Sequence, residues 1–290
     1  MAVDYGQLID QIGRLDARAR VSVLTRSIMG REIPLITLGE GRRAVAMIAC
    51  QRGDEGLTAE ILLAFVQDYL TQLARRASVL EYSVERLFAE RKIYVVPMLN
   101  PDGVEYALHG VEGQNPLRER LEKMNGGTDF GAWCANARGV DLSCNYAAGF
   151  LEYRKAHTPI NGAPCGFGGE YPESEPETAA LCRFLRFKKD ELCGLLSVGI
   201  GKGELYCGCG EKMTAKVLSA GRILARMTGF RAVRPEEIAP AGGLGEWCTL
   251  QLERPAYTLK CAPTGQKTGS ERSPLYERLR GALFSFAYLV

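Results

Sequence analysis

Three short segments carry most of the residues in this chain that could do chemistry. They are residues 51–55 (QRGDE), residues 199–201 (GIG) and Lys260 with its neighbour Cys261. Each follows or ends an apolar run that we expect to be a buried strand. In α/β sheets, ligands bind beyond the carboxyl ends of such strands. The cations Arg52 and Lys260 and the carboxylate of Glu55 are therefore expected to share a pocket that could bind an anion.

Histidine is scarce in this chain, which limits the mechanisms that it can support. The only two are His109 and His157, and neither lies at an expected strand end. A mechanism or metal centre that needs several imidazoles is therefore difficult to build here.

The elements that must position these residues alternate along the chain. After an amphipathic helix at the N-terminus, apolar runs predict strands at 21–25, 33–38, 44–50, 92–99, 192–198 and 256–261. Apolar residues at helical spacing predict helices at 57–77, 79–90, 175–189, 211–228 and 274–289. Residues 100–174 are predicted to be mostly loop. The alternation predicts one α/β domain over residues 1–290, with a mixed, mostly parallel sheet of about eight strands flanked by helices.

Composition narrows the classes of partner. Hydrophobic residues make up 46% and charged residues 24% of the 290 residues, which is ordinary for a globular protein. A net charge of +2 favours neither a nucleic-acid partner nor a membrane surface. No apolar run is long enough to span a membrane, and the N-terminus does not resemble a signal peptide. We therefore expect a cytoplasmic protein whose ten cysteines are mostly reduced and buried.

Several motifs, read in order, resemble the zinc carboxypeptidase family. They are SIMGREIPLITLGEG, ACQRGDEGLTAEILLAF, VVPMLNPDGVEYALHG, NARGVDLSCNY, ESEPETAAL, LLSVGIGKGELYCGCG and PAYTLK. The resemblance runs from about Tyr5 to the C-terminus. Within this carboxypeptidase A-like family, the branch of γ-D-glutamyl–diamino-acid peptidases is the most similar. NPDG, GVDL and SEPET are each moderately specific, and their shared order and spacing favour the family's fold.

The resemblance implies a zinc centre whose residues are largely replaced here. The family holds zinc with His-x-x-Glu at one strand end and a second His at another, and a Glu on the last core strand acts as general base. Carried over, the ligand positions are Arg52, Glu55 and Gly199, of which only Glu55 is retained, and the base position is Lys260. Moving the first motif back by one residue places Gln51 and Asp54 at the ligand positions instead, and restores no histidine.

The rest of the implied pocket also departs from the family pattern. The Asn-Arg pair that holds a substrate carboxylate in many members falls at Ser143 and Cys144, and the tyrosine that closes over substrate falls at Thr249. Arg138, with Arg118 and Arg120, could supply a carboxylate clamp. Two further alternatives stay open: a thiolate metal site among the cysteines near the pocket, and Glu246 as an acid or base. The cysteines of the first alternative are Cys144, Cys207, Cys209 and Cys248.

The expected function follows from these replacements. We expect a pseudo-peptidase that lacks cofactors and binds a peptide carboxylate or other small anion, with the head group of Arg52 or Lys260 in the zinc's place, paired with Glu55. The alternative is an active metallocarboxypeptidase that holds zinc through displaced ligands. The sequence indicates no oligomeric state.

Overall fold

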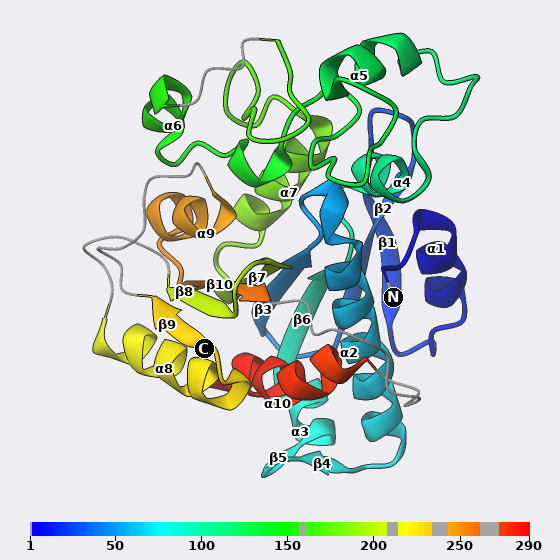
Figure 1. Ribbon diagram of the computed structural model, residues 1–290. Coiled ribbons are helices and arrows are strands. Elements are labelled where there is room, and N and C mark those ends of the chain that lie inside the picture. The colour runs from blue at the N-terminus through cyan, green and yellow to red at the C-terminus, as the bar shows by residue number, and fades with distance from the viewer. Residues whose placement is uncertain (1, 157–160, 208–213, 234–242, 262–272) are drawn as a thin grey trace.

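A single eight-stranded sheet runs through the centre of this computed structural model, which describes residues 2–156, 161–207, 214–233, 243–261 and 273–290 (Figure 1). The strand order is β1-β2-β6-β3-β7-β10-β8-β9. The four central strands, β6, β3, β7 and β10, pair in parallel with one another. The pairs β1–β2, β2–β6 and β10–β8 are antiparallel. The bounds are β1 (Arg20–Arg26), β2 (Glu32–Leu38), β3 (Arg43–Ala49), β6 (Arg91–Val96), β7 (Leu192–Ile200), β8 (Glu204–Cys207), β9 (Arg231–Val233) and β10 (Ala256–Cys261). The predicted mixed α/β sheet is confirmed.

Helices cover both faces of the sheet, because its central strands are apolar on both sides. On β3, Val45 and Met47 pack on one face, and Ala44 and Ala46 on the other. The first face is covered by α1 (Tyr5–Gly13), α2 (Gly56–Ala74), α8 (Ala215–Thr228) and α10 (Pro274–Leu289). The second is covered by α7 (Pro176–Phe187) and α9 (Leu244–Trp247), which a π-helical turn (Cys248–Leu252) continues.

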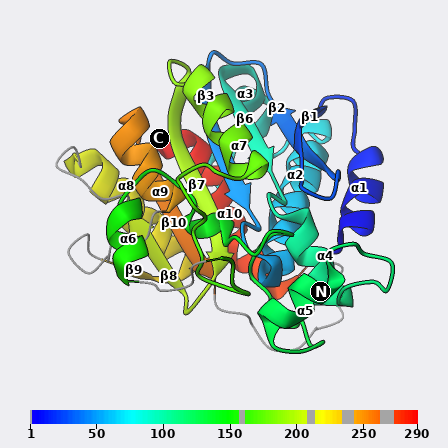
Figure 2. The same cartoon turned by 90° about the horizontal axis from the view of Figure 1, so that it is seen from above.

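A third layer lies over the carboxyl ends of the parallel strands, and Figures 1 and 2 show it gathered on one side of the molecule. It contains α4 (Pro101–His109), α5 (Arg118–Asn125), a short 3-10 helix (Leu142–Cys144) and α6 (Phe150–Ala156). Its small core includes Tyr106, Leu121 and Trp133. Most of residues 100–174 lie outside helices and strands, as predicted, but these four short helices were not predicted. These helices are short, and α5 buries only Leu121, so an apolar helical period is almost absent.

The NPDG motif, residues 100–103, forms the N-cap and the first turn of α4. Asn100 caps the helix by accepting a hydrogen bond from the backbone amide of Gly103 at 2.9 Å. Pro101 occupies the first helical position, where its missing N–H costs nothing. Asp102 is buried and accepts hydrogen bonds from Ser27, Met29 and Arg31. The motif is thus a helix start that anchors the β1–β2 hairpin.

The predicted helix at 79–90 was also wrong in its first half. Residues 78–83 form a small hairpin, β4 (Ser78–Val79) and β5 (Tyr82–Ser83), and the helix α3 spans only Val84–Glu90. Leu80 has a left-handed φ of 54°, which breaks a helix, and Ser83 caps α3. The helix predicted at 211–228 begins at Ala215, after the cap Thr214, and residues 211–213 lie outside the described part of the chain.

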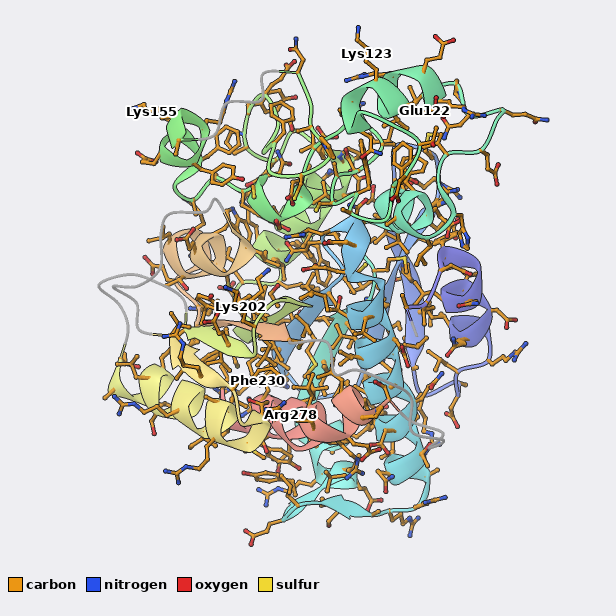
Figure 3. The ribbon with its side chains drawn as sticks, in the orientation of Figure 1. Glu122, Lys123, Lys155, Lys202, Phe230 and Arg278 are labelled. Atoms are coloured by element: carbon orange, nitrogen blue, oxygen red, sulfur yellow. The ribbon has the colours of Figure 1, made fainter. Side chains whose placement is uncertain are left out.

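The last helix ties together segments that are far apart in sequence. Figure 3 shows Arg278 of α10 beside Phe230, the residue before β9, and the guanidinium carbon lies 4.8 Å from the ring centroid. Arg278 also donates a hydrogen bond to the carbonyl of Thr228, at the end of α8.

None of the helices that the structure describes is long and apolar enough to cross a membrane.

Candidate functional site

The turn after β3 is held in place by backbone contacts with two other segments. Cys50 takes a left-handed φ of 52°, a costly conformation for a residue other than glycine. The side-chain amide of Asn100 donates to the carbonyls of Gln51 and Cys134, each at 3.2 Å. A Cβ at Gly53 would lie 2.5 Å from the Gly103 carbonyl oxygen, so only glycine fits between the segments.

Glu55 is the buried acid of this turn, with 2% of its side chain exposed. Its Oε1 accepts a hydrogen bond from the backbone amide of Ile200 at 2.9 Å, and its Oε2 accepts one from the amide of Arg52 at 3.3 Å. Burial raises the pKa of Glu55, while Lys260 and the amide of Ile200 act in the opposite direction. The carboxyl group is thus fixed across the ends of β3 and β7.

Lys260 approaches this acid from β10. It lies opposite Gly199 in the parallel pairing of β10 with β7, and its Nζ is 3.9 Å from Oε1 of Glu55. A Cβ at Gly199 would lie 2.7 Å from that oxygen and 2.9 Å from the lysine nitrogen. Glycine at this position therefore leaves the space that the Glu55–Lys260 pair fills.

Arg52 has a different partner from the one we expected. Its Nη2 lies 2.6 Å from Oδ2 of Asp54 and its Nε 3.0 Å from Oδ1, so the two form a bidentate pair. The same Nη2 lies 3.0 Å from the sulfur of Cys134. Burial would lower the pKa of Arg52, but the pairing with Asp54 and the nearby Cys134 and Asp141 together raise it. Of the two head groups proposed to pair with Glu55, only that of Lys260 lies beside it.

The side chains at the family's ligand positions do not fit a zinc ion. Zinc sites need three or four nitrogen, sulfur or carboxylate donors at about 2.0–2.3 Å from the metal. Here one carboxylate, Glu55, is available. Gly199 offers no side chain, Arg52 faces Asp54, and the ammonium of Lys260 lies 3.9 Å from Oε1 of Glu55. With Asp54 included, the two cations and two carboxylates of this site balance in charge.

The implied substrate-clamp positions are engaged in local contacts. Ser143 donates a hydrogen bond to Asp141 at 2.6 Å and lies 3.6 Å from the sulfur of Cys144, whose pKa burial raises to about 12. The hydroxyl of Thr249 donates to the carbonyl of Gly245 at 3.0 Å. These contacts give Ser143 and Thr249 local structural roles.

Arg138 lines a cavity of about 380 Å³ rather than the Glu55–Lys260 pair. Its Nη1 lies 3.7 Å from Oε2 of Glu175, and 52% of its side chain is exposed. Arg120 also lines this cavity, and Arg118 instead pairs with Glu122 on its own helix. Two arginines thus line one cavity, together with Glu170 and Glu175.

The remaining candidates take no part in the Glu55–Lys260 contact. His109 lies at the end of α4, with its Nε2 3.6 Å from Oδ2 of Asp4. Gln51 is engaged on both sides, since its amide donates to Ser197 and its oxygen accepts from Tyr146, so the alternative register offers no free ligand there.

The acid and the thiols of the two open alternatives lie in local or buried positions. Oε2 of Glu246 accepts from the Gly243 amide at 3.4 Å. Cys207 and Cys248 are buried, and burial raises their pKa values to about 11 and about 12. His157 and Cys209 lie outside the described residues.

One cluster of side chains was missed by the sequence analysis. The sulfurs of Cys134 and Cys165 and an oxygen of Asp141 all lie within 4.8 Å of one another. Cys134 and Asp141 are buried and Cys165 is exposed. Nothing in the spacing of these residues marks them as a set, because two separate loop segments bring them together.

The comparison with known families agrees with this architecture. The zinc carboxypeptidase family matches residues 6–199, and the chain belongs to that family. It is 24% identical over 291 residues to γ-D-glutamyl-L-diamino acid endopeptidase 1 of Lysinibacillus sphaericus, covering 99% of this chain and 72% of that protein. It is 24% identical to human carboxypeptidase B, covering 84% of this chain and 58% of that protein.

Solved structures show the same fold. Bovine thrombin-activatable fibrinolysis inhibitor, in complex with a tick carboxypeptidase inhibitor, superposes with a TM-score of 0.68 at 14% identity, covering 98% of this chain and 94% of that one. The murein-tripeptide amidase MpaA from Escherichia coli superposes with a TM-score of 0.59 at 19% identity, covering 97% and 94%. At these identities the likeness concerns the fold alone.

Proposed function

We propose that this chain is a pseudo-peptidase that binds a peptide carboxylate or another small anion through Lys260. The observation that carries the proposal is the Glu55–Lys260 pair, in which an ammonium lies beside the one acid retained from the family's ligand set. A lysine in place of the general base cannot deprotonate water as a carboxylate would, and a buried acid paired with a cation is a poor metal ligand.

Lys260 keeps binding capacity despite this pairing. The separation of 3.9 Å from Glu55 is the outer limit of an ion pair, and 31% of the lysine side chain is exposed. Its ammonium group carries three N–H donors, which suit a carboxylate ligand. Arg120 and Arg138, which line the 380 Å³ cavity, are a second pair of cations for an extended peptide.

The relative from Lysinibacillus sphaericus suggests the probe, a γ-D-glutamyl–diamino acid peptide with a free terminal carboxylate. We expect Lys260→Ala to weaken its binding about tenfold or more, since a hydrogen bond to a charged group contributes about 1.5–3 kcal/mol. Calorimetric titration of the wild type and the variant measures this. The matched control is Lys202→Ala, which removes the same charge from an exposed lysine just after β7 (Figure 3).

Two results would contradict the proposal. One is equal affinity of Lys260→Ala and the wild type for the free-carboxylate peptide. The other is hydrolysis of that peptide by the wild type with added zinc, abolished by a chelator, which would instead establish the second candidate function.

That second candidate is an active metallocarboxypeptidase with displaced zinc ligands. The observation that favours it is the Cys134–Asp141–Cys165 cluster, whose Cys134 sulfur lies 3.0 Å from Arg52 at the family's first ligand position. We favour the first candidate because displaced zinc ligands would still leave Lys260 at the position of the general base, where an ammonium group cannot deprotonate water.

A further inference from the structure

Two loop segments of the third layer are held side by side by backbone hydrogen bonds. The amides of Cys134 and Ala135 both donate to the carbonyl of Pro164, at 2.8 and 3.0 Å. The amide of Asp141 donates to the carbonyl of Phe167 at 2.7 Å, and that of Ala163 donates to Gly139 at 3.0 Å. Residues 163–167 therefore lie along residues 134–141 in a defined register, which fixes where their side chains meet.

The side chains that meet there are two thiols and a carboxylate. The sulfur of Cys165 lies 3.6 Å from Oδ2 of Asp141, and all three ligand atoms fall within 4.8 Å. Tetrahedral zinc, with Zn–S near 2.3 Å and Zn–O near 2.0–2.2 Å, places a sulfur and an oxygen ligand about 3.5–3.7 Å apart. The observed sulfur–oxygen separation matches that edge.

The surroundings also suit a metal bound through thiolates. Outer-shell donors orient metal ligands and stabilise their charged forms. Arg52 donates to the sulfur of Cys134 at 3.0 Å. Asp141 is oriented by the amides of Ser143 and Gly166, at 3.0 and 3.1 Å.

We infer that Cys134, Asp141 and Cys165 form a binding site for a divalent cation of the zinc type, separate from the family's own ligand positions. Thiolates select zinc over magnesium or calcium. Three protein ligands leave a fourth position for water on the exposed side of Cys165. Two thiolates, one carboxylate and the metal carry a charge of about −1, and Arg52 donates a hydrogen bond to one of the two thiolates. The inference is independent of anion binding by Lys260.

The test is metal binding by the whole chain, stripped of metal and kept reduced with a phosphine. We expect one equivalent of Zn²⁺ in competition with a chromophoric chelator, and a thiolate-to-cobalt charge-transfer band when Co²⁺ replaces it. Cys165→Ser and Cys134→Ser should each lower the affinity more than about 100-fold, beyond the 10–100-fold effect of an outer-shell partner. Cys165 is exposed, so its replacement leaves folding intact.

Controls separate this site from the other candidates. Cys193→Ser alters a partly exposed thiol on β7 and should keep full affinity. Lys260→Ala should also keep it, whatever its effect on peptide binding. Absence of stoichiometric binding, or full binding by the Cys165→Ser variant, overturns the inference. Loss of binding in Glu55→Gln, with Cys165→Ser unaffected, places the metal at the family position and overturns both proposals. A Cys134–Cys165 disulfide in the untreated protein, found by peptide mapping, also overturns it.

Discussion

At the scale of single residues, the site is defined by the ion-pair partners of its two cations. Arg52 and Lys260 are the two cations of this site. Arg52 pairs with its sequence neighbour Asp54, whereas Lys260 lies beside Glu55, which is far from it in the sequence. Asp54 satisfies Arg52, which leaves Glu55 to Lys260. Gly199 lies against this pair, and its lack of a side chain leaves room for the side chains of Glu55 and Lys260.

Gly199→Ala tests this packing. The added methyl would lie 2.7 Å from Oε1 of Glu55, so the acid and Lys260 must move and the hydrogen bond to the Ile200 amide is strained. We expect the free energy of unfolding to fall by about 1–3 kcal/mol, as for overpacked interiors. Denaturant unfolding measures it. The control is Gly13→Ala, where a Cβ meets no atom within 4 Å and no loss is expected. Unchanged stability of Gly199→Ala would mean that the pair is not closely packed.

At the scale of elements, α7 carries a buried acid, Glu177, and burial disfavours the charged form of its carboxyl group. Glu177, in the first turn after Pro176, is fully buried, and neither carboxylate oxygen receives a hydrogen bond of ordinary geometry from the described residues. Burial, followed by the charges of Asp102 and Glu175, raises its pKa to about 8, while backbone groups of Glu177 and Ile28 act more weakly in the opposite direction. The helix N-terminus favours an anion, but burial outweighs that preference.

This shift predicts a dependence of stability on pH. The folded pKa exceeds the unfolded value, so the folded state holds the proton more tightly, and the contribution of Glu177 to stability is lost as pH rises from about 4.5 through about 8. Glu177→Gln, which keeps the volume without the charge, should be more stable than the wild type by about 1–3 kcal/mol near pH 9 and lose that advantage near pH 5.

Thermal unfolding of both proteins across this pH range measures the difference. The matched control is Glu85→Gln, an exposed acid in the first turn of α3, for which no such trend is expected. A difference between Glu177→Gln and the wild type that stays constant with pH would show that Glu177 is not protonated in the folded protein.

At the scale of the whole molecule, helices from opposite ends of the chain close one face of the sheet. Asp68 on α2 is fully buried and accepts hydrogen bonds from Arg280 and Tyr276 on α10 and from Gln72. Burial alone would raise the pKa of Asp68, but these donors hold it below its usual value. Its contribution to stability is present above the unfolded pKa of about 4 and is lost as pH falls through the folded value.

Asp68→Asn should therefore destabilise the fold, because it leaves Arg280 without its carboxylate. We expect a loss of about 3–5 kcal/mol in the free energy of unfolding at neutral pH, as when one partner of a buried ion pair is removed. Denaturant unfolding measures it, provided that the free energy of unfolding depends equally steeply on denaturant in the variant and the wild type. Asp10→Asn, which breaks an exposed pair with Arg14, should leave stability unchanged. Equal effects of the two substitutions would mean that the α2–α10 contact contributes little.

Prediction from sequence succeeded where the signal was local and repeated. The apolar runs located the central strands to within about two residues at most ends, and the last helix was predicted at its observed bounds, Pro274–Leu289. It failed in the third layer, where the helices α4, α5 and α6 are short, and α5 and α6 bury only Leu121, Phe150 and Tyr153. The strands β8 and β9 were missed, because they span only Glu204–Cys207 and Arg231–Val233 and show no usable period.

The sequence alone determined the α/β class and the resemblance to a family, and it predicted the replacement of both histidine ligands. These depend on residue types and local periods, which can be read without coordinates. Only the tertiary structure decided that Arg52 pairs with Asp54, that Lys260 lies beside Glu55, and that Cys134, Asp141 and Cys165 meet. Side-chain partners are set by backbone segments far apart in sequence, and their distances arise only once the sheet and its covering loops have packed.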